Sequence, residues 1–201
     1  MKKAKKILVM VAALALTAAL AIGGTLAYLT STTETVKNTF TVGNVKITLD
    51  EAPVDANGKA TTGDRVTANS YKLLPGHEYD KDPTVHVAAG SEDCWLFVKI
   101  TDDIAAIQDA TTVADQMKAN GWTAVEGETG VYAYKETVSA GENVVVFKTF
   151  KVKGDVANEA LAAYANKTIT VQAYAVQEDG FDTAAAAWAA APLAAWATPA
   201  A

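Results

Sequence analysis

Runs in which apolar and polar residues alternate dominate the chain after its first 35 positions, and such alternation predicts β-strands. Residues rich in glycine, proline and asparagine separate the runs, as in the Pro75-Gly76 turn. Short strands joined by such turns are typical of a two-sheet β-sandwich with Greek-key or jelly-roll connections. The predicted strands are residues 36–49, 71–74, 85–88, 94–100, 131–138, 143–152 and 168–176.

Two of these runs are apolar on both faces, which predicts strands in the middle of a sheet. Residues 94–100 carry Leu96 and Val98 on one parity and Trp95 and Phe97 on the other. Residues 143–152 are apolar throughout 144–147. The intervening residues 140–142 predict a hairpin between strands 131–138 and 143–152.

The first predicted strand changes phase at Gly43-Asn44, where a bulge or bend would return its apolar side chains to one face. Before this point one face of the predicted strand carries Val36, Asn38, Phe40 and Val42. After it the same face carries Val45, Ile47 and Leu49.

Helical periodicity is confined to short insertions. It predicts helices over residues 102–120, stopped by Asn120-Gly121, and over the alanine-rich residues 155–166. A third short helix over residues 182–190 would be capped by Asp182. The expected fold is therefore mainly β: a jelly-roll-like sandwich over residues 28–190 with short helical insertions. Residues 191–201, rich in alanine and proline, are expected to form a flexible tail.

The first 27 residues have the organisation of a secretory signal peptide. Four lysines precede an uncharged apolar run, residues 7–22, and small residues follow it. Sixteen apolar residues are fewer than the roughly 20 that span a bilayer. We expect cleavage between Ala27 and Tyr28, and the alternative is a retained membrane anchor.

Charge and cysteine content narrow the possible functions. Four of the 17 basic residues and none of the 23 acidic ones precede Tyr28, so the remaining 174 residues carry a net charge of −10. Such a charge repels nucleic acid and anionic lipid, so neither is an expected partner. The single cysteine, Cys94, excludes an intrachain disulfide and is expected to be a buried residue with a raised thiol pKa.

No catalytic, metal-binding or cofactor-binding set emerges from the residues. His77-Glu78 lacks the second histidine of a His-Glu-x-x-His zinc helix and follows a turn. His86 lies within a predicted strand, where a packed or solvent-facing imidazole is the usual state. Residues 55–59 resemble a calcium loop only weakly, because Lys59 stands where an oxygen ligand would be needed. The sequence predicts a protein that is not an enzyme, with no cofactor.

Three stretches together resemble the TasA/camelysin (CalY) family. They are residues 23–45, which hold the end of the leader and the first strand, residues 71–85 around the Pro75-Gly76 turn, and residues 173–182. The resemblance implies an exported jelly-roll subunit of biofilm matrix fibres, released by a SipW-type signal peptidase. It also implies that an N-terminal segment, here residues 28–41, completes a sheet in a neighbouring subunit.

The predicted donor strand contains Val36, Asn38, Phe40 and Val42. The alternative for residues 28–35 is a frayed terminus. The expected partners are further copies of the chain and the signal peptidase, with no membrane anchor after cleavage, and the expected location is the extracellular matrix or cell surface. Two other functions stay open: a camelysin-like metalloprotease and a surface adhesin that binds through loops such as residues 50–69.

Overall fold

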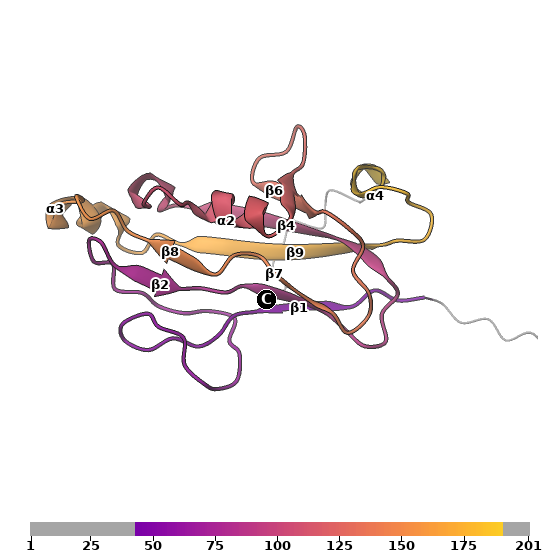
Figure 1. Ribbon diagram of the computed structural model, residues 1–201, viewed down its shortest axis with the longest axis horizontal. Helices are drawn as coiled ribbons and strands as arrows, with labels where there is room; N and C mark the ends of the chain where they lie inside the picture. Colours follow the sequence, from indigo (N-terminus) through magenta and orange to yellow (C-terminus); the bar gives the residue numbers. More distant parts are fainter. Residues whose placement is uncertain (1–42, 191–201) are drawn as a thin grey trace, which may run out of the picture. The chain divides into compact units, whose positions relative to one another are not determined.

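The strands form two layers with a hydrophobic core between them (Figure 1). A computed structural model describes residues 43–190. One layer is a four-stranded antiparallel sheet with the order β5-β6-β4-β9. Its strands are β4 (Cys94–Asp102), β5 (Trp122–Ala124), β6 (Val131–Tyr134) and β9 (Ile169–Gln177).

The second layer is a three-stranded sheet that continues into a two-stranded one. The larger sheet has the order β1-β3-β7, and β2 pairs with β8. The strands of this second layer are β1 (Ile47–Asp50), β2 (Glu78–Asp80), β3 (Thr84–Val87), β7 (Asn143–Val145) and β8 (Thr149–Lys151). Backbone hydrogen bonds from Lys81 to Lys148 and from Val146 to Pro83 bridge the interruption. The pairs β2–β8 and β3–β7 are therefore two parts of one bent antiparallel ribbon.

Strand β4 lies in the middle of its sheet, as predicted, between β6 and β9. Its inward side chains, including Leu96 and Val98, are buried against the second layer. On the outer face Phe97 is buried beneath helix α4 (Ala184–Ala190), where its ring lies 5.0 Å from that of Trp188. Both faces are covered, and this is why the run is apolar on both parities.

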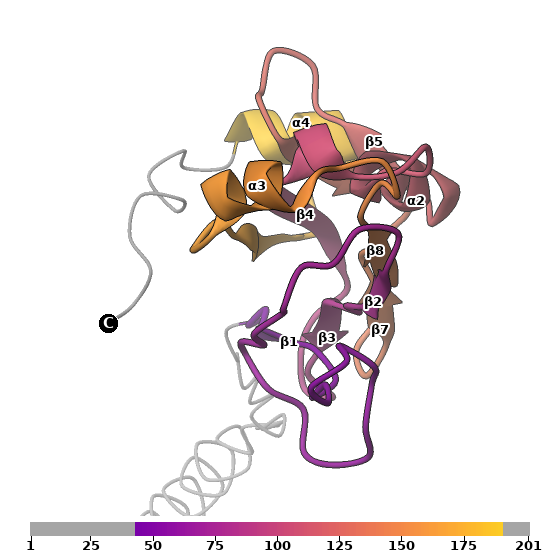
Figure 2. The same ribbon diagram turned by 90° about the vertical axis from the view of Figure 1, so that its left-hand side faces the viewer.

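The prediction of a mainly-β fold with short helical insertions is confirmed for the described residues. Strands β3 and β9 coincide with predicted strands 85–88 and 168–176 to within one residue at each end. Val45, Ile47 and Leu49 pack together against the core, as their shared parity predicts. Figure 2 shows the layer that holds β1 and β3 separated from the layer that holds β4 and β5.

Three strand predictions were wrong. Residues 71–74 form no strand, because the buried Tyr79 hydroxyl bonds the backbone there: it donates to Lys72 O and accepts from Leu74 N. The predicted hairpin does not form, since β6 pairs with β4 and β5 whereas β7 pairs with β3. The turn around Gly141 instead carries the chain from one layer to the other. Residues 143–152 were expected in the middle of a sheet, but β7 lies at an edge of its sheet.

The three helices are shorter than predicted. Residues 102–120 divide into the end of β4, a 3₁₀ turn (Ala105–Ile107) and α2 (Val113–Ala119), because Thr112 forms a capping box with Asp115. Residues 155–166 contain α3 (Asn158–Leu161) and a second 3₁₀ turn (Ala162–Tyr164). In α4 the cap is Thr183 rather than Asp182, because the Thr183 hydroxyl accepts from Ala186 N at 3.1 Å.

Candidate functional site

Side chains close one lateral side of the sandwich. Gln116 of α2 donates to Thr149 O at 2.7 Å and accepts from the backbone N–H groups of Lys148 and Thr149. Asn120 donates to Val146 O, and Trp122 Nε1 donates to Val145 O, each at 3.2 Å. These bonds satisfy backbone groups along the free edge of β7 and β8, so no further strand can add there without displacing them.

The opposite side ends at β9, whose outer edge pairs with no strand among the described residues. In an antiparallel pair, alternate residues direct both backbone groups away from the partner strand. Cys94 and Ile100 of β4 direct their N–H groups to Val138 and Gly130, on the side away from β9. The β9 residues that lie across from Cys94, Ile100 and the other even-numbered residues of β4 therefore direct their N–H and C=O groups outward, away from β4. They are Ile169, Val171, Ala173, Ala175 and Gln177.

The composition of this edge is unusual for a solvent-facing strand. Over nine residues β9 contains no charge and no proline, although most of its side chains are apolar and none is fully buried. Soluble proteins protect exposed edges with lysine, proline, bulges or a covering element, because an unpaired edge recruits other strands. The β9 edge has the chemistry of a surface that receives a strand.

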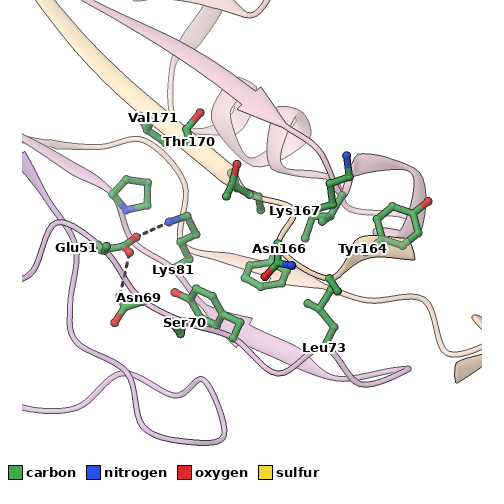
Figure 3. Close-up of a pocket in the computed structure, with 18 of the residues that line it drawn as sticks. Glu51, Asn69, Ser70, Leu73, Lys81, Tyr164, Asn166, Lys167, Thr170 and Val171 are labelled. Carbon is green, nitrogen blue, oxygen red and sulfur yellow. Dashed lines mark hydrogen bonds and ion pairs between the residues drawn. The ribbon is translucent and has the colours of Figure 1, made fainter. Parts of the chain in front are cut away.

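A pocket of about 940 Å³ opens at the Ile169 end of β9 (Figure 3). Residues 66–73, the end of β1 and the segment 158–171 form its walls. Leu73, Phe150, Leu161 and Ile169 contribute apolar surface, whereas asparagines and lysines lie among the other lining residues. The pocket extends the β9 edge into a site that can hold side chains as well as backbone.

A buried ion pair lies in the wall of this pocket. Lys81 Nζ donates to Glu51 Oε2 at 2.6 Å, with the lysine side chain 11% and the glutamate side chain 5% exposed. Asn69 Nδ2 donates to Glu51 Oε1 at 3.0 Å, so both oxygens of this carboxylate are engaged (Figure 3). Burial, with a smaller contribution from the charge of Glu51, raises the pKa of the neighbouring Tyr71.

Arg65 holds the loop that borders the pocket against β1 and the start of β3. Its guanidinium pairs with Asp50 in β1 and with Asp82 before β3, and it also donates to Thr84 Oγ1. His86 Nε2 lies 2.8 Å from Asp50 Oδ1. Burial by itself raises the pKa of Asp50, but hydrogen bonds and charge from Arg65 and His86 outweigh that effect and lower it.

This lowered pKa predicts how the stability depends on pH. A carboxylate with a depressed folded-state pKa stabilises the fold above its unfolded pKa, about 3.9, and loses that contribution as the pH falls through the folded value. The difference in unfolding free energy between wild type and Asp50→Asn should be largest near neutral pH and shrink below about pH 4. Urea unfolding across this range measures it.

The two histidines do not meet at one site. His77 Nε2 lies 2.8 Å from Asn57 O, and its ring packs edge-on against Tyr79. The His86 nitrogens face Asp50 and Asn143. Within residues 43–190 no three His, Cys, Asp or Glu side chains lie close enough together to hold a metal ion. Zinc enzymes use three protein ligands, so these residues do not fit a catalytic zinc site.

Cys94 is buried, as predicted. Burial, with a smaller contribution from the charge of Asp93, raises the pKa of its thiol to about 11. Its Sγ contacts Val138 O at 3.7 Å. The side chain packs in the core and is not positioned to act as a nucleophile.

The predicted cleavage point, Ala27 and Tyr28, and the predicted donor residues Val36, Asn38, Phe40 and Val42 lie outside the described residues. The sequence interpretation missed two features of the described residues: the uncharged outer edge of β9 and the Glu51–Lys81–Asn69 cluster. The absence of charge over residues 169–177 was the available signal for the edge. Nothing local signals the cluster, whose members lie up to 30 residues apart.

Comparison with known protein families gives a match to the N-terminal part of the chain. The family model described as camelysin metallo-endopeptidase matches residues 2–75. No curated protein and no solved structure matches the chain. Among residues 43–190 no helix has the length and apolar character needed to cross a bilayer. The resemblance to the camelysin family drawn from the sequence is confirmed by this match, which covers residues 2–75.

Proposed function

We propose that this protein is an exported structural subunit that assembles into extracellular fibres by strand addition. The N-terminal segment of one subunit, residues 28–41, pairs with the outer edge of β9 in the next. The observation that carries the proposal is the uncharged nine-residue edge of β9, which has no strand partner among the described residues. An added strand would satisfy the outward backbone groups of β9.

The composition of the two partners supports this pairing. The inward side chains beside the β9 edge include the small residues Ala173 and Ala175. A strand laid along them needs alternate apolar residues to extend the core between the layers. Residues 36–42 offer such a parity, in which Phe40 can fill space that the alanines leave. The opposite side of the sandwich offers no equivalent site, since α2 and Trp122 cover it.

Export would determine when the subunits begin to assemble. Within the cell the lysine-rich leader would stay attached to the donor segment, and cleavage by a SipW-type peptidase after Ala27 would release it. The mature protein would then lie in the matrix or at the cell surface without a membrane anchor. Its net charge of −10 would keep unassembled subunits soluble.

The proposal predicts opposite behaviour for two lengths of the chain. Purified residues 28–201 should form filaments visible by negative-stain electron microscopy and should sediment on ultracentrifugation. Residues 44–201 retain β1 to β9 but lack the donor, and should stay monomeric by light scattering. Circular dichroism checks that both are folded. Equal assembly of the two proteins would contradict strand donation.

Metalloprotease activity is the second candidate, and the description of the matching family favours it. Hydrolysis of casein that is lost on chelation and in His77→Ala would support it. The absence of chelator-sensitive activity would exclude this candidate. The described residues bring no three metal ligands together, so the structural function is preferred.

A further inference from the structure

The Glu51–Lys81–Asn69 cluster combines an amine, a primary amide and a carboxylate that bonds to both. Lys81 Nζ is 2.6 Å from Glu51 Oε2, and Asn69 Nδ2 is 3.0 Å from Glu51 Oε1. Figure 3 shows the Lys81 and Asn69 side chains reaching the same carboxylate from different segments of the chain. Glu51 can therefore exchange protons with both neighbouring nitrogens.

We propose that Lys81 and Asn69 form an intramolecular isopeptide bond with Glu51 as the proton-transferring residue. Glu51 accepts a proton from the Lys81 ammonium, and the neutral Nζ attacks Asn69 Cγ. The Nζ–Cγ bond forms and the Cγ–Nδ2 bond breaks. Two of the three ammonium protons pass through Glu51 to Nδ2, which leaves as ammonium, and Glu51 returns to its carboxylate form. No oxidant or further reactant takes part.

The surroundings of the Asn69 amide favour this reaction. Val54 N donates to Asn69 Oδ1 at 3.1 Å, and this bond would stabilise negative charge on that oxygen in the tetrahedral intermediate. Asn69 Nδ2 also donates to Ala52 O at 2.8 Å, which fixes the plane of the amide. These bonds hold the Asn69 amide in one orientation beside the carboxylate that Lys81 also contacts.

Burial shields the pair from bulk water. The Glu51 and Lys81 side chains are 5% and 11% exposed, and Tyr71 and Phe150 line the same pocket. A desolvated neutral lysine is a competent nucleophile.

Mass spectrometry of the intact, purified chain tests the proposal. The wild-type mass should fall below the sequence mass by one ammonia. Trypsin should leave residues 66–72 joined to residues 73–99, because a modified Lys81 no longer permits cleavage after it. Glu51→Gln retains both reactants but cannot transfer the proton, so it should show the full sequence mass. Asn69→Asp should give the same cross-link with loss of water.

Matched variants separate the chemistry from a structural role. Lys81→Arg retains a cation beside Glu51 and should show the full mass. Lys59→Met removes the lysine of a half-buried pair with Asp80 and should retain the ammonia deficit. Circular dichroism verifies that each protein is folded. A folded wild-type protein with its full sequence mass and normal cleavage after Lys81 would overturn the proposal, as would an ammonia deficit that persists in Lys81→Arg.

Discussion

Replacing Trp122 with alanine should destabilise the fold by about 3–5 kcal/mol, the range for truncation of a large buried aromatic residue. Trp122 is 1% exposed, and its ring lies 5.1 Å from that of Tyr134. Its Nε1 also donates to Val145 O, so the variant would lose packing and a bond that covers the β7 edge. Urea unfolding at neutral pH measures the change.

Trp95→Ala is the matched control for this prediction. Trp95 also donates through Nε1 to a backbone oxygen, that of Phe181, at 3.0 Å. It lies on the outer face of β4 and is only partly buried. Its removal should therefore cost clearly less than removal of Trp122. Equal losses in the two variants would show that Trp122 does not have the central packing role assigned to it.

Ala173→Pro should abolish filament formation and leave the subunit folded. The Ala173 N–H points to the outer edge of β9, so proline removes a donor for the added strand without breaking the ladder to β4. Its ring would also obstruct the incoming backbone. Electron microscopy and sedimentation of residues 28–201 carrying the change measure the effect.

The neighbouring position supplies an internal control. Gln172 pairs with Lys99, and by the alternation of the ladder its N–H points to β4. Gln172→Pro should therefore weaken the subunit itself and lower its thermal midpoint more than Ala173→Pro does. Ala173→Val retains the N–H group and should still assemble. Filaments of normal length from Ala173→Pro would contradict the assignment of the β9 edge as the receiving surface.

The sequence predicts a strand well where the apolar positions of that strand alone show which of its faces are buried. Residues 94–100 are apolar on both parities because β4 is covered on both faces, and this cause is visible without the structure. The sequence predicts less well which strands pair with each other. The turn around Gly141 has hairpin chemistry, yet Val87 N donates to Glu142 O and Gly141 N donates to Val87 O. These contacts with a distant strand decide that β7 leaves the sheet of β6.

Local signals also fail where side chains replace backbone partners. Residues 71–74 alternate like a strand, but the Tyr79 hydroxyl binds their backbone groups, and they pair with no strand in the described part of the chain. Asp102 begins a predicted helix, yet it extends β4 because it pairs with Ile169. The candidate site depends on such distant contacts throughout, since Glu51, Asn69 and Lys81 meet only after β1 and β3 have paired.

Residue-resolved hydrogen exchange of β9 tests the central claim most directly. The amides of Ile169, Val171 and Ala173 point outward, whereas those of Thr170 and Gln172 already face β4. On passing from monomeric residues 44–201 to filaments of residues 28–201, we expect exchange to slow strongly at the outward amides and to change little at the inward ones. Filaments whose outward β9 amides exchange as fast as those of the monomer would contradict strand addition at this edge.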